Sequence, residues 1–145
     1  MTRHVGAAIF ICILLTGAMV QAQERMAIQS NVANIRSGPG TDEAVIWQAE
    51  QYYPVIILEK KGEWRRFQDF EGDQGWVHVS LLSTIKTVVT KADNCNIRKG
   101  PGTQYDVAFR VSKGIPFKVL ETKGSWLKIE HADGDIGWIA KSLIW

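Results

Sequence analysis

Asn-Ile-Arg-Ser-Gly-Pro-Gly-Thr at residues 34–41 returns sixty-two residues later as Asn-Ile-Arg-Lys-Gly-Pro-Gly-Thr at residues 96–103. The correspondence continues without a gap as far as Ser80-Leu81, which matches Ser142-Leu143. The chain of 145 residues therefore contains one small domain twice. An interpretation made on one copy can be checked against the other.

The short apolar segments on both sides of each Gly-Pro-Gly turn predict an all-β fold. Candidate strands in the first copy are short apolar segments near residues 26–28, 32–35, 44–47, 55–58, 64–67 and 75–77, and all recur in the second copy. Pro54 and Pro116 stand just before the fourth segment, and proline suits the first residue of a strand. About five short strands per ~60 residues, separated by glycine turns, indicate a small barrel.

The domain boundaries follow from the repeat and from the start of the chain. We predict a domain at residues 23–83 and a second at residues 84–145, each a small β-barrel. The segment that joins them, near residues 83–86, has no Pro-, Gly- or Ser-rich spacer. We therefore expect two barrels in fixed or nearly fixed contact.

Residues 1–22 have the organisation of a secretory signal peptide. Arg3 and His4 form a short basic start, residues 5–20 are apolar, and Val20 and Ala22 are the small residues that a signal peptidase reads. The alternative is an uncleaved anchor helix, but the apolar run is shorter than the ~20 residues that span a bilayer. We predict cleavage, an exported protein that is periplasmic or extracellular, and no transmembrane segment in the mature chain.

Charge and cysteine content narrow the partners of the mature chain. It keeps sixteen of the seventeen Lys and Arg residues and all fifteen Asp and Glu residues, for a net charge of +1. Nucleic-acid binding needs a clustered excess of cations, so we predict no nucleic-acid partner. Cys95 is the only mature cysteine, so its thiol is either buried or available to a partner, and Ala33 at the matching position of the first copy favours burial.

The recurring motifs resemble those of the bacterial SH3 domain. Both copies carry Asn-x-Arg-x-Gly-Pro-Gly-Thr, then Gly-x-Trp, then Gly-Trp-Val or Gly-Trp-Ile before a leucine. Residues 62–67 and 75–82 are especially similar to a proteobacterial branch of secreted proteins with paired domains. The resemblance implies two tandem SH3-like β-barrels. Family members attached to cell-wall hydrolases bind peptidoglycan, so it also implies peptidoglycan or its peptide stems as the ligand.

Aromatic side chains are the first group of candidate ligand-binding residues. We interpret the recurring indoles mainly as core, because one indole buries a large area, with ligand contact as the alternative; they are Trp64, Trp76, Trp126 and Trp138. Three tyrosines have no aromatic counterpart in the other copy: Tyr52, Tyr53 and Tyr105. We expect these three in exposed loops, where binding of sugars or peptides and plain loop filling are equally good explanations.

Basic side chains are the second group. Arg65 and Arg66 crowd one predicted hairpin together with Lys60 and Lys61. Such a cluster either forms a solvated strand edge that discourages strand pairing or contacts an anionic wall polymer or lipid headgroup. Arg36 and its counterpart Arg98 could bind a carboxylate or phosphate, but their recurrence beside a turn favours a structural bond to a backbone carbonyl.

Residues for catalysis or metal binding do not recur. Cys95, His78 and His131 each face an unrelated residue in the other copy, although a thiol enzyme needs Cys and His brought together. Asp69 and the acidic residues after it resemble a calcium loop, but the glutamate that an EF-hand requires is Ser80 here. We predict no catalytic residue, no cofactor and no metal.

These observations predict a non-catalytic, exported binding module of the cell envelope that contacts peptidoglycan or its peptide stems. The alternative is a periplasmic adaptor that binds an envelope protein through a barrel edge or an aromatic groove.

Overall fold

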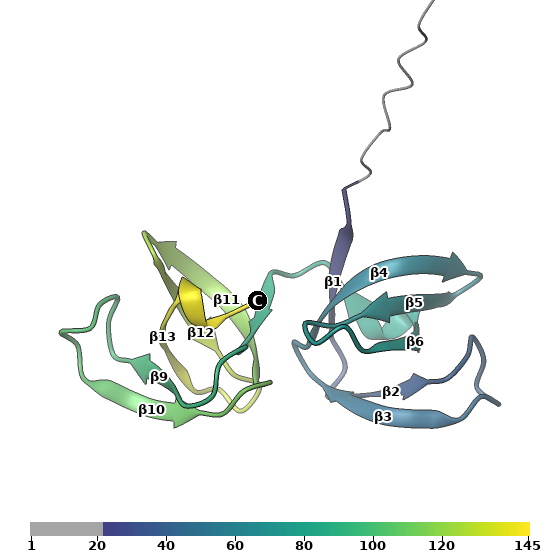
Figure 1. The fold of residues 1–145 in the computed structure, drawn as a ribbon, viewed down its shortest axis with the longest axis horizontal. Helices are drawn as coiled ribbons and strands as arrows, with labels where there is room; N and C mark the ends of the chain where they lie inside the picture. The colour runs from purple at the N-terminus through teal and green to yellow at the C-terminus, as the bar shows by residue number, and fades with distance from the viewer. Residues whose placement is uncertain (1–21) are drawn as a thin grey trace, which may run out of the picture.

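The computed structural model describes residues 22–145, which form two β-sheets, one from each copy of the repeat (Figure 1). All strand pairs are antiparallel, and the spatial order of the first sheet is β3-β2-β6-β5-β4-β1-β7. Its strands are β1 (Glu24–Ile28), β2 (Val32–Arg36), β3 (Val45–Glu50), β4 (Pro54–Lys61), β5 (Trp64–Gln68), β6 (Gln74–His78) and β7 (Leu82–Ser83).

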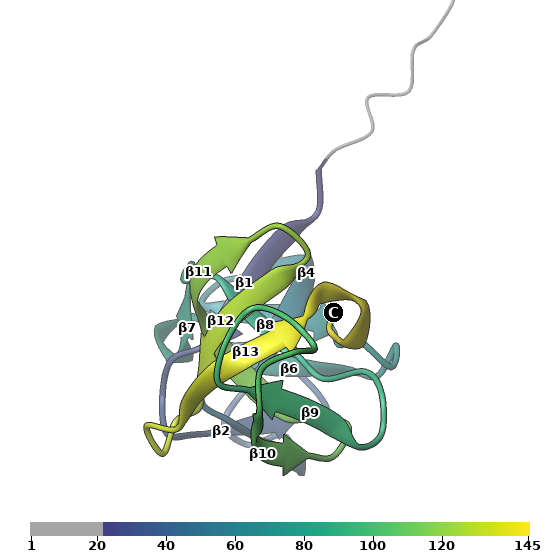
Figure 2. The ribbon, with the colours of Figure 1, turned by 90° about the vertical axis from the view of Figure 1, so that its left-hand side faces the viewer.

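The second sheet repeats this arrangement, in the order β10-β9-β13-β12-β11-β8. Its strands are β8 (Thr87–Val89), β9 (Cys95–Arg98), β10 (Val107–Val111), β11 (Pro116–Lys123), β12 (Trp126–Glu130) and β13 (Ile136–Ala140). A short 3₁₀ turn follows the last long strand of each copy, η1 (Val79–Leu81) and η2 (Lys141–Leu143). Each sheet curls around its own core (Figures 1 and 2). The predicted all-β fold of two small SH3-like domains is confirmed.

The predicted signal peptide lies outside the described residues, apart from Ala22. Between residues 22 and 145, no helix is long and apolar enough to cross a membrane.

Alternation along the strands decides which side chains fill the cores. In β2, Ala33 and Ile35 are fully buried, whereas Val32 and Asn34, which alternate with them, are exposed. The largest core residue comes from a different strand in each domain. Phe67 of β5 packs with Val55 in the first domain, and the matching positions in the second hold Ile129 and Phe117. The total side-chain volume is nearly conserved by this exchange, which is the kind of change that cores tolerate best.

The two domains are in direct contact, as the absence of a flexible spacer predicted. Val89 of β8 is fully buried and belongs to the hydrophobic cluster of the first domain, and Trp145 packs against the same cluster. Arg25 of β1 donates from Nη2 to the carbonyl oxygens of Trp145 (2.9 Å) and Thr87 (3.2 Å). Its guanidinium carbon lies 4.2 Å from the centroid of the Trp145 ring, a cation–π arrangement.

Gly75→Ala is expected to destabilise the first domain. An added Cβ would overlap Cγ2 of the buried Ile35, and forcing extra atoms into a filled core costs about 1–3 kcal/mol. Urea unfolding followed by tryptophan fluorescence measures the change in the free energy of unfolding. Gly40→Ala is the matched control, because the nearest atom there is Oδ1 of the exposed Asp42, which can rotate away. An equal loss of stability in both variants would contradict this explanation.

Candidate functional site

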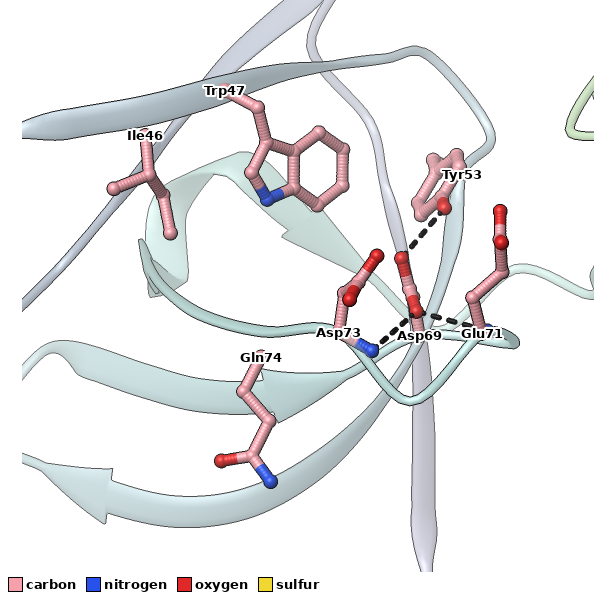
Figure 3. A pocket seen from close by; sticks show the side chains of 7 residues that line it. All are labelled: Ile46, Trp47, Tyr53, Asp69, Glu71, Asp73 and Gln74. Carbon is pink, nitrogen blue, oxygen red and sulfur yellow. Dashed lines mark hydrogen bonds between the residues drawn. The ribbon is translucent and has the colours of Figure 1, made fainter.

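One cavity recurs at the same place in both domains. The domain-one cavity has a volume of about 350 Å³ and is lined by Ile46, Trp47, Tyr53, Asp69, Glu71, Asp73 and Gln74 (Figure 3). The domain-two cavity has a volume of about 390 Å³ and is lined by Phe109, Arg110, Val111, Ser112, Ile115, Phe117, His131, Asp133 and Asp135. Five pairs of lining residues are at matching positions of the repeat: Trp47 and Phe109, Tyr53 and Ile115, Asp69 and His131, Glu71 and Asp133, Asp73 and Asp135.

The buried carboxylate of Asp69 organises the turn between β5 and β6. Its Oδ2 accepts a hydrogen bond from the hydroxyl of Tyr53 at 2.9 Å, and its Oδ1 accepts from the backbone N–H groups of Glu71 (3.0 Å) and Asp73 (2.9 Å). These three bonds compensate for the loss of water around a carboxylate that is only 5% exposed. The turn is therefore held in one shape beside the cavity (Figure 3).

Tyr53 is buried, so the expectation that it lies in an exposed loop is wrong. The preceding residue, Tyr52, is half-buried and has a positive φ of 73°, and the chain reverses there. The ring of Tyr53 packs edge-on against Trp47 (5.4 Å) and Phe70 (6.5 Å). Burial is the main reason why the pKa of Tyr53 is raised, and the negative charge of Asp69 and its hydrogen bond add to the effect. The bond to Asp69 is what allows the phenol to be buried.

Trp47 and Asp73 lie on opposite sides of the domain-one cavity. Trp47 comes from β3 and is half-buried, and its ring also meets Phe67 edge-on at 6.2 Å. In Figure 3 the carboxylate of Asp73 points toward this indole. Glu71 pairs with Lys113 Nζ at 3.4 Å, whereas no partner of the Asp73 carboxylate is found among residues 22–145. An aromatic ring opposite a free carboxylate can bind an ammonium group, through cation–π attraction and an ion pair.

The domain-two cavity keeps this arrangement with different residues. His131 replaces the buried aspartate, and its Nδ1 lies 3.0 Å from Oδ1 of Asp133. The pKa of Asp133 is lowered, first by the hydrogen bond from the backbone N–H of Asp135 and then by His131. The carboxylate of Asp135 has no partner in the described part of the chain and shares the cavity with Phe109. Each domain thus has an aromatic ring and an available carboxylate at matching positions.

Three of the four recurring tryptophans lie outside the cores, so their interpretation as core is wrong. Trp64, Trp76 and Trp126 are half-buried and belong to neither hydrophobic cluster. The alternation of β6 explains this for Trp76, since the buried Gly75 and Val77 on either side of it face inward. Trp138 is buried, at 8% exposed, but it also lies outside the cluster of its domain.

The other predicted binding residues do not gather into one surface. Arg65 donates from Nη1 to the carbonyl oxygens of Gly62 and Trp64, and Arg66 forms an ion pair with Glu59 at 2.9 Å. Lys60 is likewise paired with Glu24. Tyr105 is 42% exposed and lies beside the second Gly-Pro-Gly turn, in the other domain from Arg65 and Arg66. Of the nine predicted residues, Tyr53 lines the domain-one cavity, Arg66 and Trp76 line a different one with Arg36, and Trp64 lines another.

The structural role predicted for the recurring arginines is confirmed. Arg36 donates from Nη1 to the carbonyl oxygens of Thr41 (3.0 Å) and Glu43 (2.9 Å), across the Gly-Pro-Gly turn. Arg98 makes the same two bonds, to Thr103 (3.3 Å) and Tyr105 (3.0 Å). The recurring arginine therefore closes the turn in each domain.

Cys95 is buried, as predicted. Its Sγ donates to the carbonyl oxygen of Ala92 at 3.1 Å, and burial raises the pKa of the thiol. A buried thiol with a raised pKa is a poor nucleophile. Within the described residues, no group of three or more His, Cys, Asp or Glu side chains is arranged to hold a metal ion.

Both copies of the repeat match one family model, the bacterial SH3 domain, over residues 29–84 and 91–145. The chain belongs to this family. The bacterial SH3 resemblance inferred from the recurring motifs is therefore confirmed.

Curated relatives of this bacterial SH3 chain are larger proteins. "Putative N-acetylmuramoyl-L-alanine amidase YrvJ" of Bacillus subtilis is 27% identical over 155 residues, covering 94% of this chain and 30% of that protein. "Probable cell wall amidase LytH" of Staphylococcus epidermidis is 36% identical over 63 residues, covering 43% of this chain and 22% of that protein. The chain thus spans less than a third of either relative. A solved NlpC/P60 family protein from Bacillus cereus is 15% identical, with a TM-score of 0.39, over 84% of this chain and 56% of that chain.

Tyr53→Phe is expected to remove part of the pH dependence of stability in the alkaline range. The pKa of Tyr53 in the folded protein lies above its ordinary value of 10.0, so the unfolded chain releases this proton first. The stability that this group contributes is therefore complete below about pH 10 and is lost as the pH rises further. Urea unfolding at a series of pH values between about 8 and 11 measures the loss.

The same substitution has an effect at neutral pH. Asp69 Oδ2 loses its hydroxyl donor, which should lower the free energy of unfolding by about 1–3 kcal/mol. Tyr105→Phe is the control, because Tyr105 is exposed and should keep the wild-type pH dependence. If Tyr53→Phe kept the wild-type slope above pH 10, Tyr53 would not be the group responsible.

Proposed function

We propose that this protein is a non-catalytic, exported module that binds the cell wall, and that each domain takes an ammonium group of a peptidoglycan peptide stem into its recurring cavity. The observation that supports this proposal is the pairing of an aromatic ring with an available carboxylate at the same place in both domains, Trp47 with Asp73 and Phe109 with Asp135. Peptide stems present amino groups, which are the chemical complement of such a cavity.

The wall as the target is supported by the relatives. YrvJ and LytH are named as amidases, LytH as a cell wall amidase, and part of each is similar to the SH3 repeats of this chain. A non-catalytic role is supported by the state of Cys95, whose buried thiol with a raised pKa is unsuited to nucleophilic attack. Ligand binding by the two cavities is therefore the role that we assign to this chain.

Two cavities at matching positions of one chain suit a polymer that repeats its ligand. Each cavity is small and open, so a single ammonium group would be held weakly. When one site is occupied, the other sees neighbouring stems at a high effective concentration, which raises the overall affinity without any new contact. Binding by the whole chain should therefore exceed binding by either cavity alone.

A protein-interaction adaptor is the second candidate function. Strand β3 is at the end of its sheet and pairs only with β2, and its Val45 and Ile46 are 46% and 50% exposed. A strand of a partner protein could add to this edge. Stoichiometric co-purification of one envelope protein, abolished by Ile46→Lys, would favour this function over wall binding.

The test of wall binding is retention by purified sacculi. The variant Asp73→Asn/Asp135→Asn keeps the size of both side chains and removes the charge of the available carboxylate from each cavity. Each substitution should weaken binding about tenfold, because a charged partner of the ammonium group is lost. The fraction of protein that sediments with sacculi, measured over a concentration series, gives the apparent affinity.

The control variant is Asp42→Asn/Asp106→Asn, which removes one exposed carboxylate from each domain outside the cavities. It changes the net charge by the same amount and should bind like the wild type. Absence of retention of the wild-type protein would contradict the wall as the target. Equal retention of the two double variants would contradict the cavities as the binding sites.

A further inference from the structure

A second kind of cavity lies on the outer face of the first domain. It has a volume of about 360 Å³ and is lined by Val32, Asn34, Arg36, Thr41, Gln48, Trp64, His78 and Leu81; we call it the Trp64 cavity. Strands β2 and β6 are paired only at Arg36 and Trp76, and the cavity lies beyond that pair. Its polar residues come from β2, β3 and the turn between them on one side, and its aromatic side chains, Trp64 and His78, come from β5 and β6 on the other.

The two amide side chains of the Trp64 cavity are arranged to bind a group that is both donor and acceptor. Gln48 Nε2 donates to Asn34 Oδ1 at 2.9 Å, which fixes the orientation of both amides. This bond leaves Gln48 Oε1 as an acceptor and Asn34 Nδ2 as a donor, and neither has a partner within the described part of the chain. An acetamido group offers the matching pair, a carbonyl oxygen and an N–H.

The indole of Trp64 is held in place on the opposite side. Trp64 is half-buried, and the ring of His78 meets it at 90° with 5.3 Å between centroids. His78 is itself fixed, since its Nδ1 accepts from the backbone N–H of Ser80 (3.2 Å) and its Nε2 lies 3.1 Å from Glu63 Oε2. A positioned, partly exposed indole is suited to stack against the apolar face of a sugar ring.

No carboxylate lines the Trp64 cavity, in contrast to the domain-one cavity. Its one permanent charge is the guanidinium of Arg36, whose Nη1 is already bonded to two carbonyl oxygens. The cavity is therefore unsuited to an ammonium group and suited to a neutral, polar ligand.

We propose that the Trp64 cavity binds an N-acetylated amino sugar. The sugar ring stacks on Trp64, Asn34 Nδ2 donates to the acetamido carbonyl, and Gln48 Oε1 accepts from the acetamido N–H. The identification of this sugar with the glycan strand of peptidoglycan rests on the proposed function, whereas binding of the sugar itself does not. One chain would then contact the glycan through the Trp64 cavity and the peptide stems through the two recurring cavities.

The second domain lacks the acceptor supplied by Gln48 and the ring supplied by His78. Arg110 replaces Gln48, and its Nε donates to Asn96 Oδ1 at 3.0 Å, so the bond to the asparagine is kept. A guanidinium has no acceptor, so nothing at that position can receive the acetamido N–H. Ala140 also replaces His78, so no ring positions Trp126 from that strand. The sugar site is therefore specific to the first domain.

The replacement of Gln48 by Arg110 in the second domain suggests a substitution that the fold tolerates. Gln48→Arg reproduces the residue of the second domain, where the fold accommodates it, and should leave the structure intact. The probe is triacetylchitotriose, followed by ¹H–¹⁵N NMR titration of the full mature chain. In the wild type we expect shifts of the Trp64 indole N–H and of the Asn34 side-chain amide. Gln48→Arg should weaken binding about tenfold, since an acceptor of one hydrogen bond is lost.

Two comparisons make the assignment specific. Cellotriose, which has the ring but no acetamido group, should also bind about tenfold more weakly. Trp64→Ala should abolish the shifts, whereas Trp126→Ala, which removes the counterpart indole of the second domain, should not. Shifts confined to the second domain, equal affinity for the two sugars, or no response of Trp64 to triacetylchitotriose would each overturn the proposal.

The outcome is separable from that of the sacculus experiment. Triacetylchitotriose has neither an ammonium group nor a peptide, so Asp73→Asn/Asp135→Asn should bind it like the wild type. Sugar binding that persists while sacculus retention fails would contradict the wall proposal alone. Retention lost in the double aspartate variant without any sugar binding would contradict the Trp64 cavity alone.

Discussion

The separation of core from surface in the first domain depends on the alternation of side chains along three adjacent strands, β2, β6 and β5. In a domain of about sixty residues, one row of each strand must fill the core, which leaves the other row for the surface. Ile35, Val77 and Phe67 occupy the inner row and are fully buried. The outer row therefore presents Asn34, Arg36, Trp76, His78 and Trp64. A shift of the register by one residue would exchange the two rows. The register that buries the core residues is therefore also the register that places these polar and aromatic side chains on the surface.

Within this shared frame the two domains differ where side chains reach solvent or complete a turn. The buried aspartate that holds the acidic turn of the first domain is replaced by His131, yet the turn keeps its backbone bonds, from His131 to Asp135 and from Gly134 to His131. The amide that borders the Trp64 cavity is replaced by Arg110, which still bonds the asparagine beside it. The backbone of the repeat is thus preserved by alternative side-chain bonds, while the charge and the hydrogen-bonding capacity of each cavity change.

The sequence predicted the fold well, because the repeat allowed each strand and turn to be checked twice. It also predicted the role of Arg36 and the burial of Cys95, since both follow from the small or rigid residues around them. It misplaced three of the four recurring tryptophans, because recurrence indicates a constrained position without telling which face of a strand is constrained. The burial of Tyr53 was missed for a related reason: it depends on a hydrogen bond to Asp69, sixteen residues away. Neither Trp47 nor Asp73 stood out, since only the folded chain brings β3 against the turn before β6.

The contact between the domains affects how far this protein can be treated as modular. The cluster at the centre of the first domain includes Val89, which belongs to the second copy of the repeat, and Trp145 packs onto it. A fragment that stops at the boundary of the repeat would expose that part of its interior to water. The first SH3 domain is therefore not suited to be used alone in a fusion protein. To obtain a single recognition unit, one would have to place polar residues on the first-domain surface that Val89 and Trp145 cover. The other option is to keep both domains together.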